Sequence, residues 1–269
     1  MIEGKNVEFL ASRLKEICVD AGGIIMEVYH SKKLNTIEKS DKSFVTQADI
    51  DANNYIKDQL KISWPSLAVV SEEDNVLPNS SAQFDRFWLV DPLDGTKEFV
   101  NGSNEFTVNI ALIEHSKPVL GVVYQPAIDL LYWGGDGFGA FKESNGAQEA
   151  IFVSRTELNQ LKRVIVSKSH FNDDTQFLID FLGEVKLVYA GSSLKFCKVA
   201  EGLADIYPRL APTCEWDTAA AQAVLEGAGG IVVDMSCKPL RYGKSSILNP
   251  SFIASSSLEI IKPLFNEHF

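Results

Sequence analysis

Residues 88–99, which read WLVDPLDGTKEF, carry the strongest structural signal in the chain. An apolar run typical of a buried strand ends at Asp91, and Asp94 follows three residues later. Pro92 fixes its own φ angle and keeps the preceding residue out of the helical region, so we expect a sharp turn. Such a turn would bring both carboxylates to one point and leave the Leu93 carbonyl free as a third oxygen ligand. A site of oxygen ligands alone favours Mg²⁺.

The two residues after this turn suit the binding of a phosphate group. Gly95 has no side chain, so its backbone can approach a ligand closely. If a helix begins at Gly95 and Thr96, its unpaired N–H groups would hold a phosphate beside the metal ions. The alternative interpretation is that the segment is only a turn with a structural role, because short DPxDG stretches are common.

Two further acidic groups lie next to apolar segments. Glu72 and Glu73 follow the apolar run LAVV, and Glu215 and Asp217 stand at the start of an expected helix. Each group taken alone is compatible with a solvated loop or a helix cap. Three such groups, each beside a strand or helix that would be buried, together predict a metal site.

The composition excludes some classes of function. The 269 residues include 36 acidic and 25 basic ones, which gives a formal net charge of −11. A long polyanion is therefore an unsuitable ligand, whereas a small anion can still bind where local cations or metal ions reverse the field. The sequence shows no secretory signal and no apolar run of membrane-spanning length, and its four scattered cysteines are expected to be reduced. We expect a cytoplasmic protein.

The pattern of apolar residues changes near residue 150. Before that point we expect a long helix from about Val7 to Val28, a second helix beginning near Thr46, and several short strands that include a hairpin. After it, strand and helix segments alternate, as in an α/β protein. The alternating segments are 163–169, 173–183, 185–191, 192–202, 204–210 and 217–230. We therefore divide the chain into an N-terminal α+β half, 1–150, which carries most metal ligands, and a C-terminal α/β half, 151–269, which completes the metal site and the substrate pocket.

Both acidic motifs resemble signatures of a known family. Residues 88–99 resemble the D-P-[ILV]-D-G-T signature of the inositol monophosphatase family, and residues 215–230, EWDTAAAQAVLEGAGG, resemble its second, W-D-x-A signature. The likeness extends over residues 39–249. Members of this family are magnesium-dependent, lithium-sensitive phosphatases. The resemblance implies the layered αβαβα sandwich of the inositol monophosphatase and sugar phosphatase type.

Finer features resemble one branch of that family, the 3′(2′),5′-bisphosphate nucleotidases. These features are KEF at residues 97–99, SSLKFCKVAEGLADIYPR at 192–209 and PTCEWDTAAA at 212–221. The resemblance implies hydrolysis of adenosine 3′,5′-bisphosphate to AMP and phosphate by a metal-activated water. Two alternatives stay open: a phosphatase of the same family that acts on inositol 1-phosphate or a sugar phosphate such as fructose 1,6-bisphosphate, and a non-catalytic regulatory protein on the same fold. A serine or cysteine hydrolase is disfavoured because the chain has no GxSxG motif.

The resemblance also implies a set of ligands for two to three Mg²⁺ ions. Glu72, Asp91 and the carbonyl of Leu93 would bind the first ion. The second would be bound by Asp91, Asp94 and Asp217, with Asp91 as the bridge. Glu72 would also help to hold a third, weaker ion through water.

The catalytic group implied by the resemblance is Asp49, Glu72 and Thr96. Asp49 lies in VTQAD at residues 45–49, which is similar to the family's V-T-x-x-D motif. In the family this acid accepts a hydrogen bond from the threonine that matches Thr96, and the pair positions the attacking water. Phe44 stands where the family commonly has proline, so we expect a less rigid loop before Asp49.

A nucleotide bisphosphate has a second phosphate that needs its own cations. Lys195 and Arg209 are the candidates, since arginine binds phosphate through two N–H groups and lysine acts as a point charge. Their alternative role is that of solvated surface charges. The expected substrate contacts are Gly95, Thr96, His170, Ser192, Lys195, Arg209 and Asp217.

The expected partner is a small nucleotide bisphosphate. We expect no nucleic acid polymer, no obligate protein partner and a monomer in preference to a dimer. The resemblance also allows a peripheral location on the inner face of a membrane, although no segment of the sequence resembles an anchor.

Overall fold

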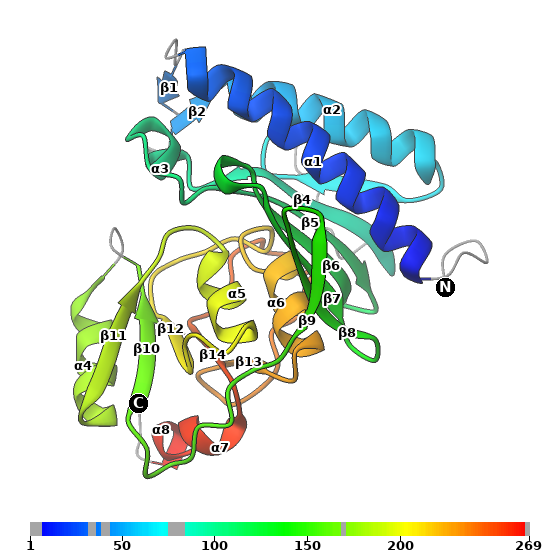
Figure 1. The fold of residues 1–269 in the computed structure, drawn as a ribbon. Coiled ribbons are helices and arrows are strands. Elements are labelled where there is room, and N and C mark those ends of the chain that lie inside the picture. The colour runs from blue at the N-terminus through cyan, green and yellow to red at the C-terminus, as the bar shows by residue number, and fades with distance from the viewer. Residues whose placement is uncertain (1–6, 32–35, 39–43, 75–83, 168–170, 267–269) are drawn as a thin grey trace.

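A computed structural model describes residues 7–31, 36–38, 44–74, 84–167 and 171–266, and it arranges them in five layers (Figure 1). Helices form the two outer layers and the central layer, and two β-sheets lie between them. The fold predicted from the sequence, a layered αβαβα sandwich, is therefore confirmed.

The first layer consists of helices α1 (Val7–Ser31) and α2 (Gln47–Ser63), which pack against each other and against one face of a sheet. The buried residues of α1 recur at three- and four-residue steps, so they share the face that meets the sheet. A short hairpin of β1 (Thr36–Glu38) and β2 (Phe44–Thr46) leads into α2. Thr46 caps α2 in a capping box with Asp49, which fixes Asp49 in the first turn.

The second layer is a seven-stranded sheet whose strands follow one another in chain order. They are β3 (Ala68–Ser71), β4 (Arg86–Asp94), β5 (Thr107–Glu114), β6 (Lys117–Gln125), β7 (Leu130–Gly135), β8 (Gly139–Ser144) and β9 (Ala147–Ile151). Strands β3 and β4 are parallel, and the other neighbours are antiparallel. The hairpin predicted among the short strands is present and is formed by β7 and β8, which pair antiparallel.

Strand β4 does not end at Asp91, and the sharp turn expected there is a β-bulge. Asp91 pairs with Asn109 of β5, and Asp94 pairs with Thr107, so the chain takes one extra residue on the β4 side. A bulge bends the strand while the pairing with β5 continues. It thereby keeps both carboxylates at the end of the sheet.

The central layer contains α5 (Leu194–Ala200) and α6 (Ala219–Gly227), which lie between the two sheets in Figure 1. Alanines on α6 let the helix approach the seven-stranded sheet closely. The approach is closest at Gly121 of β6, where an added Cβ would lie 2.0 Å from the carbonyl oxygen of Ala220. This tight packing fixes the start of α6 against the sheet.

The fourth layer is a five-stranded mixed sheet in the order β11-β10-β12-β14-β13. Its strands are β10 (Lys162–Val166), β11 (Val185–Tyr189), β12 (Ile206–Arg209), β13 (Ile231–Asp234) and β14 (Phe252–Ser255). The fifth layer, outside it, holds α4 (Asp173–Leu182), α7 (Leu258–Ile261) and α8 (Pro263–Asn266). The seven-stranded sheet ends at Ile151, and the five-stranded sheet begins at Lys162. The division into two halves near residue 150 stays a prediction about folding units.

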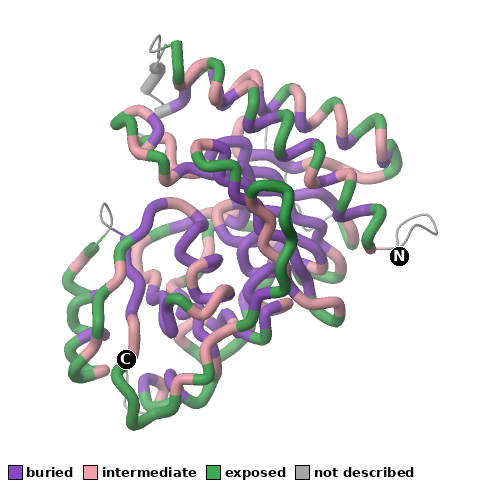
Figure 2. Tube along the Cα trace, in the orientation of Figure 1, coloured by how far each residue is buried: buried purple, intermediate pink, exposed green. Residues whose placement is uncertain are grey.

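The buried residues lie mainly between the layers (Figure 2). One cluster joins the seven-stranded sheet to the central helices and part of the second sheet, and another lies under α1 and α2. In the described part of the chain no helix combines the length and the apolar character needed to cross a membrane.

Candidate metal centre and substrate cleft

A cleft of about 550 Å³ opens where the end of β4 meets the starts of α5 and α6. Its floor is acidic: Glu72, Asp91, Asp94 and Asp217 all line it. Sequence positions far apart are therefore brought to one place by the layering of the two sheets around the central helices.

Three of the predicted metal ligands form a compact cluster. One carboxylate oxygen from each of Glu72, Asp91 and Asp217 lies within 4.8 Å of the others. Parallel pairing of β3 with β4 sets Ser71 opposite Val90, so Glu72 and Asp91, the next residues, lie side by side. Asp217 comes from the turn before α6, where its Oδ2 accepts a hydrogen bond of 2.8 Å from the Cys214 N–H. Carboxylate oxygens at this spacing can share a divalent cation.

Among the four carboxylates, the surroundings of Asp91 fit a metal ligand best. It is only 1% exposed, and its Oδ1 accepts a 3.1 Å hydrogen bond from the Leu93 N–H. Its Oδ2 is buried and has no hydrogen-bond partner among the described residues. Burial, and then the charges of Glu72, Asp94 and Asp217, raise the pKa of Asp91 well above its ordinary value. A buried carboxylate with an unused oxygen and three acidic neighbours fits a Mg²⁺ ion, whose charge would offset both effects.

Asp94 is positioned by a buried polar triad that the sequence analysis did not identify. Its Oδ2 accepts a hydrogen bond of 2.5 Å from the Ser193 N–H. The Ser193 hydroxyl in turn lies 2.7 Å from Asn109 Oδ1 and 2.9 Å from the Thr107 hydroxyl. Burial, followed by the charge of Asp217, raises the pKa of Asp94 to about 7. The available signal was the pair of polar residues two apart in TVNIALIE, which share one face of a strand that is otherwise apolar.

Asp49 and Thr96 meet at the edge of this cluster. Asp49 Oδ2 accepts hydrogen bonds from the N–H and the hydroxyl of Thr46, at 2.7 and 2.6 Å. Thr96 Oγ1 lies 3.2 Å from Asp49 Oδ1 and 3.2 Å from the Leu93 carbonyl oxygen, so its hydroxyl proton has two acceptors. Burial raises the pKa of Asp49 to about 6 despite the Thr46 hydrogen bonds. Phe44, which stands where the family commonly has proline, pairs through its backbone with Glu38 in the hairpin. Asp49 lies next to Thr96 although this proline is replaced.

The predicted helix start after the acidic turn is present. Helix α3 (Thr96–Val100) begins at Thr96 with Gly95 as its N-cap. Gly95 has a φ angle of 91°, and an added Cβ would lie 3.0 Å from the Glu105 carbonyl oxygen. Both the left-handed backbone and the close approach require glycine here. Gly95 and Thr96 line the cleft beside the carboxylates.

The two predicted phosphate-binding cations face the same cleft as the carboxylates. Lys195 is 4% exposed, so its interpretation as a solvated surface charge is wrong. Its Nζ donates to the Ser192 carbonyl oxygen at 2.5 Å and lies 5.4 Å from the centre of the Tyr207 ring. Burial lowers the pKa of Lys195 to about 8, although the charge of Asp94 opposes the shift.

Arg209 approaches the cleft from the end of β12. One terminal nitrogen donates to the Pro212 carbonyl oxygen at 3.2 Å, while its buried Nε has no partner within the described residues. Ser192 also lines the cleft, with a positive φ of 44°. His170, the remaining predicted contact, lies outside the residues that the structure describes.

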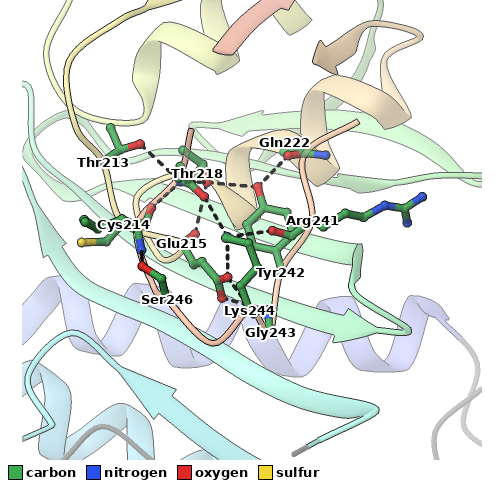
Figure 3. A network of polar contacts seen from close by, with 12 residues as sticks. Thr213, Cys214, Glu215, Thr218, Gln222, Arg241, Tyr242, Gly243, Lys244 and Ser246 are labelled. Atoms are coloured by element: carbon green, nitrogen blue, oxygen red, sulfur yellow. Dashed lines mark hydrogen bonds and ion pairs between the residues drawn. The ribbon is translucent and has the colours of Figure 1, made fainter. Parts of the chain in front are cut away.

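The third acidic group divides into two parts with different surroundings. Asp217 lines the cleft, whereas Glu215 does not; Glu215 is 1% exposed and lies in the polar network of Figure 3. Glu215 accepts hydrogen bonds from the N–H groups of Gly243 and Lys244, at 2.9 and 3.1 Å, and pairs with Lys244 Nζ at 2.5 Å. This pairing could not be predicted from the sequence, because a lone lysine at position 244 resembles any surface lysine.

Comparisons with known proteins agree on one family. Residues 6–268 match the profile described as the inositol monophosphatase family. The chain is 45% identical to the 3′(2′),5′-bisphosphate nucleotidase CysQ of Escherichia coli (strain K12) over 249 residues, 90% of this chain and 99% of that protein. It is 38% identical to the CysQ of Buchnera aphidicola over 92% of this chain and 94% of the relative. A solved structure of CysQ from Bacteroides thetaiotaomicron superposes with a TM-score of 0.79 at 36% identity, and covers 93% and 98% of the two chains.

Proposed function

This chain belongs to the inositol monophosphatase family, and on that premise we propose that it is a magnesium-dependent 3′(2′),5′-bisphosphate nucleotidase that converts adenosine 3′,5′-bisphosphate to AMP and phosphate. The observation that supports the proposal most is that one cleft is lined by a cluster of carboxylates and also by two cationic side chains. The carboxylates of Glu72, Asp91 and Asp217 suit metal ions that bind one phosphate. Lys195 and Arg209 line the same cleft and suit a second phosphate.

We expect two to three Mg²⁺ ions. Glu72, Asp91 and the Leu93 carbonyl would hold the first, and Asp91, Asp94 and Asp217 the second. When bound, the ions supply positive charge that makes water more acidic and neutralises the oxygen of the leaving group. The unpaired Oδ2 of Asp91 and the raised pKa values of its neighbours support this assignment.

The residues of the chain orient the reactants. Thr96 can donate its proton to Asp49 and accept a hydrogen bond from the attacking water, which then faces the phosphorus atom. Asp49 stays in place because Thr46 donates two hydrogen bonds to it. The backbone N–H groups of Gly95 and Thr96 would bind oxygens of the departing phosphate. The water attacks phosphorus directly as the bond to the 3′-oxygen breaks, so no covalent enzyme intermediate forms.

A side-by-side phosphate-release assay tests the proposal. Adenosine 3′,5′-bisphosphate, inositol 1-phosphate and fructose 1,6-bisphosphate are compared with Mg²⁺, with EDTA, and with Mg²⁺ plus Li⁺. We expect the highest kcat/KM for the nucleotide, no turnover in EDTA and inhibition by Li⁺. A higher kcat/KM for inositol 1-phosphate would contradict the substrate, and magnesium-independent binding without turnover would favour a regulatory protein.

The second-phosphate site has its own prediction. Lys195→Ala and Arg209→Ala should each raise KM for adenosine 3′,5′-bisphosphate about 10- to 100-fold, because each removes a charge-assisted hydrogen bond. KM for adenosine 3′-monophosphate should change much less. Lys198→Ala is a matched control, since Lys198 lies on the same helix but pairs with Glu201. If the preference for bisphosphate over monophosphate stayed unchanged in both variants, this assignment would be wrong.

A further inference from the structure

Part of the cleft lining is less polar than the acidic cluster. Pro212, Cys214 and Leu248 belong to this part, and Leu248 is 53% exposed. The segment 240–249 that carries Leu248, here called the strap, passes over the residues that lead into α6 (Figure 3). Single exposed leucines are common on protein surfaces, so Leu248 can serve as a binding surface only if its backbone is held in place.

The backbone around Leu248 is held by several hydrogen bonds. Leu248 forms an antiparallel bridge with Cys214. The Asn249 N–H donates to the Thr213 carbonyl at 2.8 Å, and Asn249 Nδ2 donates to the Cys214 carbonyl at 2.7 Å. The Glu215 N–H donates to the Ile247 carbonyl at 2.8 Å. The strap is thus paired with the same residues, 213–215, that lead to the metal ligand Asp217.

The ion pair of Figure 3 fixes the other end of the strap. Lys244 Nζ meets buried Glu215 at 2.5 Å and also donates to the Arg241 carbonyl at 2.8 Å. Because neighbouring side chains of an extended segment point to opposite sides, Ile247 packs on the core while Leu248 lines the cleft. Leu248 is therefore an apolar surface placed in advance at the cleft.

The chemistry of the cleft decides what this surface contacts. Carboxylates and cations account for the two phosphates of the proposed substrate, and the remaining part of that substrate is a neutral, flat heteroaromatic base. A volume of about 550 Å³ is suited to a whole small ligand and not to a phosphate alone. We propose that Leu248, together with Pro212, forms the wall against which the nucleobase packs, an inference that rests on the proposed nucleotidase activity.

The test uses two substrates that differ only in the base. One is deoxyadenosine 3′,5′-bisphosphate, and the other is 1,2-dideoxyribose 3,5-bisphosphate, which has hydrogen in place of the base. Leu248→Ser should raise KM for the nucleotide about 5- to 10-fold and leave KM for the baseless sugar unchanged, because only the former buries apolar surface. Leu248→Met should keep KM close to that of the wild type. Leu203→Ser is the control, since Leu203 is 51% exposed but does not line the cleft.

The outcomes separate this inference from the proposed function. If wild-type protein hydrolyses the nucleotide and Leu248→Ser has the same KM for it, the base wall is wrong and the nucleotidase stands. An equal rise of KM for both substrates would also overturn the wall, because it would indicate a disturbed strap. If the wild type hydrolyses neither bisphosphate, the proposed function fails and the wall fails with it. Unchanged melting temperatures for both leucine variants establish that they are folded.

Discussion

Two aspartates of this chain show how differently a buried carboxylate can be used. Asp94 lies among like charges in the cleft, and burial raises its pKa to about 7. Asp205 lies outside the cleft, and burial would raise its pKa too. There, however, hydrogen bonds from Arg163, Ser154 and Thr156 outweigh burial and hold the pKa at about 2. Asp205 is therefore charged and satisfied, whereas Asp94 needs an ion.

This contrast predicts opposite effects of the same substitution. Asp94→Asn should lower kcat by more than about 100-fold. Substitution of a residue that only supports a metal ligand costs about 10- to 100-fold in activity, and substitution of the ligand itself should cost more. The free energy of unfolding of this variant in EDTA should stay equal or rise, because one repelling charge is gone. Asp205→Asn should lose about 3 kcal/mol of folding free energy and keep most activity. Urea unfolding and phosphate release measure both, and an Asp94→Asn enzyme of wild-type activity would contradict the metal assignment.

At the level of the elements, the strap depends on one ion pair. Glu215 is almost fully buried, and Lys244 is its cation. Removal of one partner leaves a buried charge without compensation. Asp217 lies only two residues after Glu215, so loss of the ion pair should also disturb the candidate metal centre.

We expect Lys244→Met to lower the free energy of unfolding by about 3 kcal/mol. The double variant Lys244→Met with Glu215→Gln should recover part of this loss, because it no longer buries a lone carboxylate. Urea denaturation of the wild type, the two single variants and the double variant gives the coupling energy between Lys244 and Glu215. Additive effects of the two substitutions would show that the pair does not act as a unit.

Several elements could be predicted from the sequence for clear physical reasons. The helix at Gln47–Ser63 has a capping residue and apolar periodicity, and the helix at Thr96–Val100 follows a glycine with a left-handed backbone. The bulge in β4 was mistaken for a turn, because proline after an acid indicates a change of direction but not its extent. Strands β13 and β14 were not predicted. They are four residues each, and it is their pairing within the second sheet that defines them.

The acidic cluster could likewise be predicted from its two motifs, whereas its supports could not. Ser193, Asn109 and Thr107 act through hydrogen bonds across 84 and 86 positions of sequence separation. Lys244 meets Glu215 across 29 positions. Contacts of this kind form only when the layers pack against each other, so no local sequence pattern predicts them.

On the scale of the whole molecule, the candidate metal centre joins the seven-stranded sheet to the central helical layer. Asp91 belongs to β4 and Glu72 directly follows β3, while Asp217 belongs to the turn before the central helix α6. Without ions, the three carboxylates oppose their own approach. Ion binding at this junction should therefore stabilise the entire molecule.

This arrangement predicts an unusual pH dependence of stability. The pKa values of Asp49, Asp94 and Asp217 are raised to about 6, 7 and 6 from an ordinary 3.8, chiefly by burial. From pH 4 to pH 7 the native state therefore binds more protons than the unfolded state. In EDTA the melting temperature should fall as the pH rises from 5 to 8.

Magnesium should reverse this trend. Its ligands must be deprotonated, so the stabilisation by Mg²⁺ should grow with pH. It should reach about 2.7 kcal/mol when the concentration is one hundred times the Kd. Thermal melts at several pH values, with EDTA or Mg²⁺, measure both effects, and Asp94→Asn should flatten the EDTA curve. A melting temperature in EDTA that rises with pH would contradict the raised pKa values.

The order in which the acidic residues occur along the chain matters for biosynthesis. Glu72 and Asp91 leave the ribosome long before Asp217 and the strap that follows it. Because chains begin to fold from the N-terminal side as they emerge, the first sheet can form before the acidic cluster is complete. A nascent chain lacks both cations, Lys195 and Arg209, and the last carboxylate until synthesis has passed residue 217. We therefore expect a chain that ends before Asp217 to have no phosphatase activity.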